Sequence, residues 1–179
     1  MDLVSAVIVA IWVMLPAYIP NNVAVLVGGG RPVDGGRTMG GSRLLGDGKT
    51  WRGTVGGIAA GIALALLLNA LNGPLTNDIE LPLFSWGIIL AFPIGALLGD
   101  ILASFVKRRT GRERGSAFPL VDQLDFVVVA LIAGVLVDPG WMLSVFTPLV
   151  FAIVILVTPV LHLATNGIAY LVGLKNEPW

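Results

Sequence analysis

Three polar side chains near the end of one apolar stretch have the types and spacing for chemistry. Asp100, Ser104 and Lys107 are spaced i, i+4 and i+7, so in a helix they share one face. A charged side chain inside a membrane segment costs about 3 kcal/mol unless it has a partner or lies near the interface. A salt bridge to a neighbouring arginine would explain Asp100 alone, but the combination favours a functional site.

Two further carboxylates open the next apolar stretch. Asp122 and Asp125 share a helical face, and they converge on Asp100 if the two helices pack as an antiparallel pair. Capping of the helix N-terminus would explain Asp122 but not all three acidic residues. Carboxylates without cysteine or a nearby histidine suit Mg²⁺, which typically binds one or two carboxylates plus substrate phosphates. We therefore predict a Mg²⁺ site at Asp100, Asp122 and Asp125.

Ten cations lie in two polar segments, at about 28–53 and 106–118. Cytoplasmic loops collect Lys and Arg for topology alone. Because the carboxylates lie on the same side, these cations also favour binding of a triphosphate group and of a phospholipid head group. The ten are Arg31, Arg37, Arg43, Lys49, Arg52, Lys107, Arg108, Arg109, Arg112 and Arg114.

The first polar segment contains the glycine-rich sequence Gly46-Asp-Gly-Lys-Thr-Trp-Arg-Gly53. Its Gly-Lys-Thr resembles half of a phosphate-binding P-loop, but Arg43 stands where that motif needs glycine, and no strand precedes it. What remains is a turn that presents backbone N–H groups near the start of a helix, which is an unspecific anion site. Its side chains for an anion are Lys49, Thr50 and Arg52.

The only histidine, His162, lies in the last apolar stretch and shares a helical face with Asn166 and Tyr170. A hydrogen bond between packed helices is the favoured role for it, with a catalytic role as the alternative. No serine or threonine has an evident base, so we expect no nucleophilic triad.

The elements that must position these residues are membrane helices. The chain is 56% hydrophobic and only 12% charged, and its mean hydropathy is +0.89. Soluble domains average roughly 45–50% and 25%. The net formal charge is zero, and we expect no nucleic-acid partner. There is no cysteine, which excludes disulfides and thiolate metal sites.

A transmembrane helix needs about 20 mostly apolar residues, and this length predicts five spans in one polytopic domain over residues 1–179. They lie at about 3–20, 54–71, 82–105, 119–137 and 141–163. With five spans all eleven cations fall on one side, which the positive-inside rule makes the cytoplasm. We expect an all-α cell-membrane protein with its N-terminus outside, its C-terminus in the cytoplasm and its active site facing the cytoplasm. We also expect a groove between the third and fourth spans that admits lipid tails from the bilayer.

The spacing of the polar residues resembles a known signature. Ser104-x-x-Lys107-Arg108 and Asp122-x-x-Asp125 resemble the CTP-dependent phosphatidate cytidylyltransferases, although Glu113-Arg114 replaces their Lys-Asp pair and only Phe118-Pro119 remains of their glycine-rich segment. The whole chain is more similar to the archaeal CDP-archaeol synthases. That similarity extends over Leu15–Asn22, Gly46–Gly53, Gly99–Phe126 and His162–Trp179.

The resemblance implies a Mg²⁺-dependent reaction at the membrane. CTP and the diether 2,3-bis-O-geranylgeranylglycerol 1-phosphate would give the CDP-activated lipid and pyrophosphate. The attacking lipid phosphate is already an anion, so no general base is needed, and positioning with charge neutralisation is the main task. On this resemblance Asp100, Asp122 and Asp125 bind the metal, Lys107 is a further catalytic residue, and the substrate-binding residues are Asp47, Lys49, Thr50, Arg52, Ser104, Arg108 and Arg109.

Two alternatives use the same residues. A CTP-dependent polyprenol kinase would transfer the γ-phosphoryl group to a lipid alcohol. A small anion transporter would use the cations as a selectivity ring, although they lie outside the apolar stretches.

Overall fold

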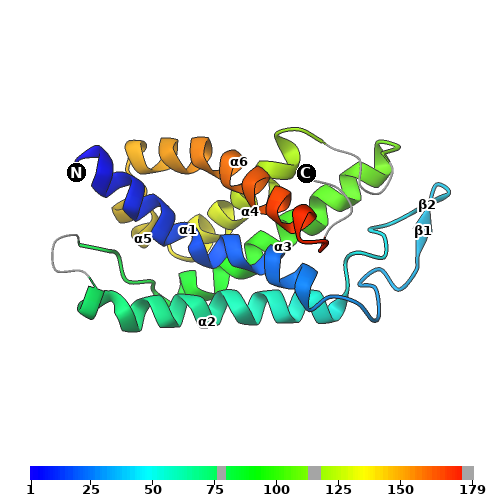
Figure 1. The fold of residues 1–179 in the computed structure, drawn as a ribbon, viewed down its shortest axis with the longest axis horizontal. Helices are drawn as coiled ribbons and strands as arrows, with labels where there is room; N and C mark the ends of the chain where they lie inside the picture. The colour runs from blue at the N-terminus through cyan, green and yellow to red at the C-terminus, as the bar shows by residue number, and fades with distance from the viewer. Residues whose placement is uncertain (76–79, 113–117, 175–179) are drawn as a thin grey trace.

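The chain folds into six helices with one small hairpin, as seen in a computed structural model that describes residues 1–75, 80–112 and 118–174 (Figure 1). Glu113, Arg114 and Lys175, which entered the analysis of the sequence, lie outside the described residues. In order, the elements are α1 (Leu3–Leu26), β1 (Thr38–Met39), β2 (Ser42–Arg43), α2 (Trp51–Leu75), α3 (Trp86–Arg109), α4 (Val121–Val137), α5 (Pro139–Val145) and α6 (Pro148–Leu171).

Four of the helices are long and apolar enough to cross a membrane: α1, α2, α3 and α6. The prediction of a helical, multi-pass membrane protein is confirmed in this form. The fourth expected span corresponds to α4, whose 17 residues place it at the lower limit for a crossing. The first polar segment departs from the expected all-helical chain, because it contains the short β1–β2 hairpin and an isolated antiparallel β-bridge between Pro32 and Thr50.

The fifth expected span, 141–163, is not one continuous helix. α5 ends at Val145, and α6 begins at Pro148 after Thr147, whose side chain accepts a hydrogen bond from the Val150 N–H. Proline fits the first turn of a helix because its missing N–H has no partner there anyway. The apolar composition continues across the break, so hydrophobicity alone could not reveal it.

α3 and α4 pack in direct backbone contact, and two glycines make this contact possible. A Cβ atom at Gly95 would lie 2.7 Å from the Ala130 Cα, and one at Gly99 would lie 2.5 Å from the Asp125 carbonyl oxygen. Small residues let helices approach closely in lipid, where packing rather than hydrophobicity holds helices together. The contact fixes α4, and with it Asp125, against α3.

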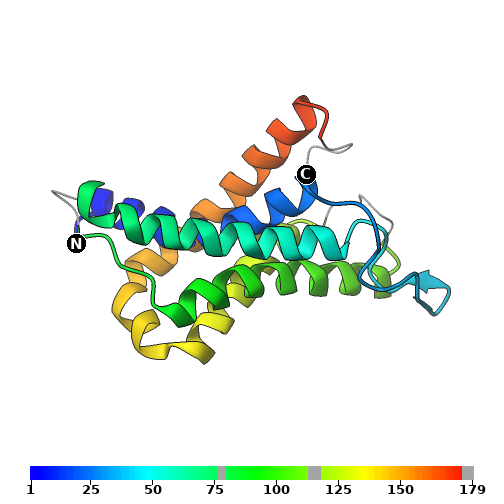
Figure 2. The same cartoon turned by 90° about the horizontal axis from the view of Figure 1, so that it is seen from below.

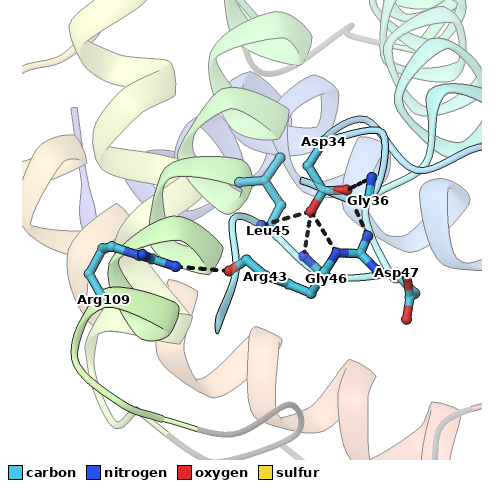
Figure 3. Close-up of polar contacts among 7 residues, drawn as sticks. All are labelled: Asp34, Gly36, Arg43, Leu45, Gly46, Asp47 and Arg109. Carbon is cyan, nitrogen blue, oxygen red and sulfur yellow. Dashed lines mark hydrogen bonds and ion pairs between the residues drawn. The ribbon is translucent and has the colours of Figure 1, made fainter. Parts of the chain in front are cut away.

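The first polar segment folds around one buried carboxylate, Asp34, whose side chain is 1% exposed. It accepts backbone hydrogen bonds from Gly36 (3.0 Å), Leu45 (3.1 Å) and Gly46 (3.2 Å), and Arg43 Nη2 lies 2.7 Å from its Oδ1 (Figure 3). The Arg43 guanidinium holds the pKa of Asp34 well below its usual range. A sequence rich in glycine thus acquires a defined shape.

Arg109, at the end of α3, holds the hairpin from the other side. Its guanidinium donates to the carbonyl oxygens of Met39 and Ser42. It also donates to the Arg43 carbonyl oxygen at 3.0 Å (Figure 3). Because its donors point at backbone carbonyls, Arg109 positions the hairpin, and its predicted role in substrate binding stays a prediction.

Gly99→Ala is expected to destabilise the protein by about 1–3 kcal/mol, because the added methyl group meets backbone that cannot move aside. Thermal unfolding in detergent measures the effect. Gly167→Ala in α6 is the matched control, since a Cβ there meets nothing within 4 Å and alanine favours a helix by roughly 0.5–1 kcal/mol. Equal effects of the two variants would contradict close packing at Gly99.

Asp34→Asn is expected to increase amide hydrogen exchange over residues 31–50 by about tenfold or more, because it removes the charge that Arg43 and three N–H groups share. Asp47→Asn is the control, since Asp47 also pairs with Arg43 but its side chain is 65% exposed.

The pH dependence follows from the lowered pKa of Asp34. Its contribution to stability is complete above the pKa of an unfolded Asp, about 3.9, and is lost as pH falls toward the lower folded value. We therefore expect the protection of the hairpin in the wild type to be constant between about pH 5 and 8. A steep loss of protection in that range would contradict the assignment.

Candidate active site

A cavity of about 530 Å³ runs between α1, α2, α3, α4 and α6. One part of its wall is polar and carries charge, and the other part is apolar. The polar residues include Lys49, Thr50, Asp100, Asp122 and Asp125, and the apolar ones include Ile11, Leu15, Ile19, Leu97 and Leu161. A ligand with a charged head and an apolar body matches this division.

Two lysine–carboxylate pairs organise the charged part. Lys49 Nζ, from the glycine-rich segment, contacts Asp100 Oδ2 of α3. Lys107 Nζ lies 2.6 Å from Asp122 Oδ1 of α4. The four side chains are between 15% and 31% exposed, so each pair is partly shielded from water. The predicted convergence of α3 and α4 therefore brings both carboxylates to one cavity, each with a cation from another segment.

Asp122 also fixes the start of α4. Its Oδ2 accepts a hydrogen bond from the Phe118 N–H at 2.9 Å, while the Gln123 side chain accepts from the Leu120 N–H. Leu120 has φ +65° and ψ −42°, a conformation that costs a residue with a Cβ about 1–3 kcal/mol. Strain of this kind concentrates at functional sites and persists where the surroundings enforce it.

Asp125 lies one turn further along α4, partly buried in the cavity wall. One of its oxygens accepts from the Phe126 N–H at 2.5 Å, and within the described residues it makes no salt bridge. It is thus the carboxylate of the three that carries no lysine partner.

The oxygen donors suit Mg²⁺ only in part. Asp100, Asp122 and Asp125 line one cavity, but among residues 1–75, 80–112 and 118–174 no three acidic or histidine side chains gather closely enough to hold a metal. One or two carboxylates completed by substrate phosphates is a common arrangement for Mg²⁺. The donor set therefore fits a metal that arrives with phosphates better than a cage made by the protein alone.

The remaining predicted residues do not line the cavity themselves. Arg108 follows Lys107 on α3, and its guanidinium comes within 3.7 Å of the position of a Cβ at Gly46. Asp47 pairs with Arg43 at 2.6 Å and is largely exposed. The residues that do not line the cavity are Asp47, Arg52, Ser104, Lys107, Arg108 and Arg109, although Lys107 reaches it through Asp122.

The apolar lining of the cavity comes from several helices, including Ile11, Leu15 and Ile19 of α1, Leu97 of α3 and Leu161 of α6. α3 and α4 are in backbone contact at Gly95 and Gly99, and the groove for lipid tails between the third and fourth spans stays a prediction. Tyr18 of α1 donates to Thr158 Oγ1 of α6 at 2.8 Å, because the Thr158 hydroxyl itself donates to the Val154 carbonyl. Beyond this contact α6 leans away from the other helices (Figure 2).

Three residues that were not predicted as site residues also line the cavity, two from α6 and one from α1. His162 lines the cavity with its ring 5.9 Å from that of Phe126, and Asn166 lines it one turn later. Tyr170, predicted on the same face, does not line the cavity and is 45% exposed. Asn21 of α1 was not assigned a role from the sequence; its signal is an amide near the end of an otherwise apolar helix.

Comparison with known proteins assigns the chain to a family. Residues 2–179 match the family model described as CarS-like CDP-archaeol synthase. The CDP-archaeol synthase of Halobacterium salinarum is 60% identical over the full length of both chains, and that of Archaeoglobus fulgidus is 48% identical over 99% of this chain and 100% of its own. A solved structure described as an intramembrane enzyme for archaeal membrane lipids biosynthesis shares 41% identity, with a TM-score of 0.70 over 88% of this chain and 92% of its own. The chain belongs to the CDP-archaeol synthase family.

Proposed function

We propose that this protein is a CTP-dependent cytidylyltransferase that activates a membrane lipid phosphate, 2,3-bis-O-geranylgeranylglycerol 1-phosphate, in archaeal phospholipid biosynthesis. The observation that carries the proposal is the divided cavity, with two lysine–carboxylate pairs at one part and apolar side chains at the other. The similarity to CDP-archaeol synthases along the whole chain supports it.

The chemical step is an attack of a lipid phosphate oxygen on the α-phosphorus of CTP. A new P–O bond forms there, the bond from the α-phosphorus to the oxygen bridging to the β-phosphate breaks, and pyrophosphate leaves with the electron pair. The attacking oxygen carries negative charge near neutral pH, so no base has to remove a proton. The cavity accordingly needs cations and exact positioning more than a proton acceptor.

Lys49 and Lys107 are the residues placed for this task. In the absence of substrate each is held on a carboxylate. Phosphate oxygens of CTP offer each ammonium group an equivalent anionic partner, so the lysines can exchange partners without losing compensation of their charge. Thr50 and the backbone N–H groups beside Lys49 add neutral donors to the same wall.

Asp100, Asp122 and Asp125 are proposed to hold Mg²⁺ together with the phosphates of CTP. The metal supplies neutralisation of the charge that develops on the phosphates. The carboxylates hold the phosphate end of the nucleotide at the end of α3 and α4, next to Lys49. As cytosolic CTP must reach this end, we propose that the two basic segments and the C-terminus face the cytoplasm and the N-terminus lies outside.

The lipid is proposed to enter between α1 and α6. Apolar residues of both helices line the cavity there, and α6 leans away from α1 beyond the Tyr18–Thr158 contact (Figure 2). The two isoprenoid tails can remain in the bilayer while the phosphate reaches the charged part.

A label experiment tests the reaction. Purified protein is incubated with Mg²⁺, the diether phosphate and CTP labelled at either the α or the γ phosphorus. Label transferred to lipid from the α position alone is expected. Transfer from the γ position, with a polyprenol as acceptor, would identify the kinase instead, and anion flux in liposomes without any turnover would identify a transporter.

Asp100→Asn and Asp122→Asn are each expected to lower turnover by about 100-fold or more, because each removes the charge that holds a lysine and a metal in place. The measurement is initial rate against Mg²⁺ concentration. Asp138→Asn is the control, since Asp138 caps α5 and bonds Ser85 at 2.6 Å outside the cavity. Near-normal rates at limiting Mg²⁺ for either cavity variant would remove that residue from the metal site.

A further inference from the structure

A second cavity, the outer cavity, lies between the first polar segment, the start of α2 and the last turns of α3. These segments meet at the end of the molecule that carries the β1–β2 hairpin (Figure 1). No residue lines both the outer cavity and the cavity of the candidate active site. The outer cavity has a volume of about 480 Å³, which is within the range of small-molecule sites, about 300–1,000 Å³. Its wall carries Arg31, Arg37, Trp51 and Phe105.

The two arginines give the outer cavity a positive charge. Neither guanidinium forms an ion pair with a side chain of residues 1–75, 80–112 or 118–174. Asp34 belongs to the same wall, but its side chain is 1% exposed and is already held by Arg43 and by backbone N–H groups. The described part of the wall thus offers a ligand two cations and one compensated carboxylate, which suits an anion.

The aromatic and apolar side chains place the outer cavity at the membrane surface. Trp51 is the first residue of α2, a helix long and apolar enough to cross a membrane, and it is 54% exposed. Tryptophan is enriched where membrane helices reach the interface. Val55 of α2 and Leu102 of α3 lie about one turn deeper than Trp51 and Phe105, and they are 62% and 53% exposed. An anion with apolar tails therefore matches both parts of this surface.

We propose that the outer cavity binds the phosphate group of an anionic phospholipid of the surrounding bilayer. Arg31 and Arg37 contact the phosphate, since a planar guanidinium bonds phosphate oxygens in bidentate geometry. The tails lie along the exposed apolar side chains of α2 and α3. A soluble phosphate ester offers the same charge, but it has no apolar part to cover Trp51 and the side chains below it. This lipid is distinct from the substrate, so the inference goes beyond the proposed function.

Backbone hydrogen bonds connect the outer cavity to Lys49 in the candidate active site. The Val33 N–H donates to the Lys49 carbonyl at 2.8 Å. The Trp51 N–H donates to the Arg31 carbonyl at 3.1 Å. A phosphate held by the two arginines restrains the chain on one side of this pairing, and the pairing passes the restraint to the segment that carries Lys49. We therefore expect the bound lipid to slow amide exchange of this pair of segments.

The test measures binding by calorimetry to purified full-length protein in a neutral detergent, without CTP. The probes are short-chain phosphatidylglycerol, short-chain phosphatidylcholine and glycerol 3-phosphate. Selective binding of phosphatidylglycerol is expected, with slower amide exchange at Val33 and Trp51. Arg31→Gln and Arg37→Gln are each expected to weaken this binding about five- to tenfold, because each removes one charged contact to the phosphate.

Arg112→Gln is the matched control, because it removes the same charge from the second polar segment, outside the outer cavity. The Arg112 guanidinium lies over the Phe118 ring, 4.1 Å from its centroid. This variant is expected to bind phosphatidylglycerol like the wild type. An equal loss in Arg112→Gln would overturn the proposal, because diffuse charge would then explain the binding.

The other probes separate the remaining explanations. Equal binding of phosphatidylcholine would remove the role of the anionic head group, and equal binding of glycerol 3-phosphate would identify a site for soluble anions; either result would overturn the proposal. Weaker CTP binding with unchanged phosphatidylglycerol binding would assign Arg31 and Arg37 to the nucleotide, with the same consequence. Selective phosphatidylglycerol binding by a protein that transfers no cytidylyl group would refute the proposed function and leave the lipid site standing.

Discussion

Carboxylates at the ends of apolar helices need cationic partners, and this need connects the separate parts of the structure. Asp100 and Asp122 each meet a lysine from a different segment. The first pair ties the glycine-rich segment to α3, and the second ties α3 to α4. Breaking either pair by removing one partner would leave a partly buried charge uncompensated, which costs more than the pair contributes while intact. The pairs therefore order the charged part of the cavity.

The placement of Lys49 depends on contacts far from the cavity. Glycine-rich segments lose much backbone entropy on folding, so this one needs strong local contacts. Asp34 supplies them from within the segment, and Arg109 supplies them from α3 (Figure 3). The end of α3 carries Lys107 itself. Through Arg109 it also fixes the shape of the segment that carries Lys49. One helix thus aligns both lysines with the carboxylates.

The sequence predicted the helices well, because apolar length is a local property that survives folding in a membrane. It also predicted the grouping of Asp100, Asp122 and Lys107, since helical spacing fixes which side chains share a face. It did not reveal the break before Pro148, which lies within a continuous apolar stretch, or the roles of Asp34 and Arg109, which depend on contacts across up to 70 residues. The sequence also could not show that α1, α2 and α6 contribute to the cavity beside α3 and α4, because this depends on contacts between helices that are far apart in the chain.

Leu120 has a consequence for which substitutions this chain can accept. Its positive φ opposes stability. The start of α4 is nevertheless held in this form, because Asp122 accepts a hydrogen bond from the Phe118 N–H and Gln123 accepts one from the Leu120 N–H. Glycine would adopt the same backbone at lower cost and would also let the turn relax into other shapes. Selection for a more stable protein and selection for a fixed Asp122 would therefore favour different residues at this position, as happens where a working site stores strain.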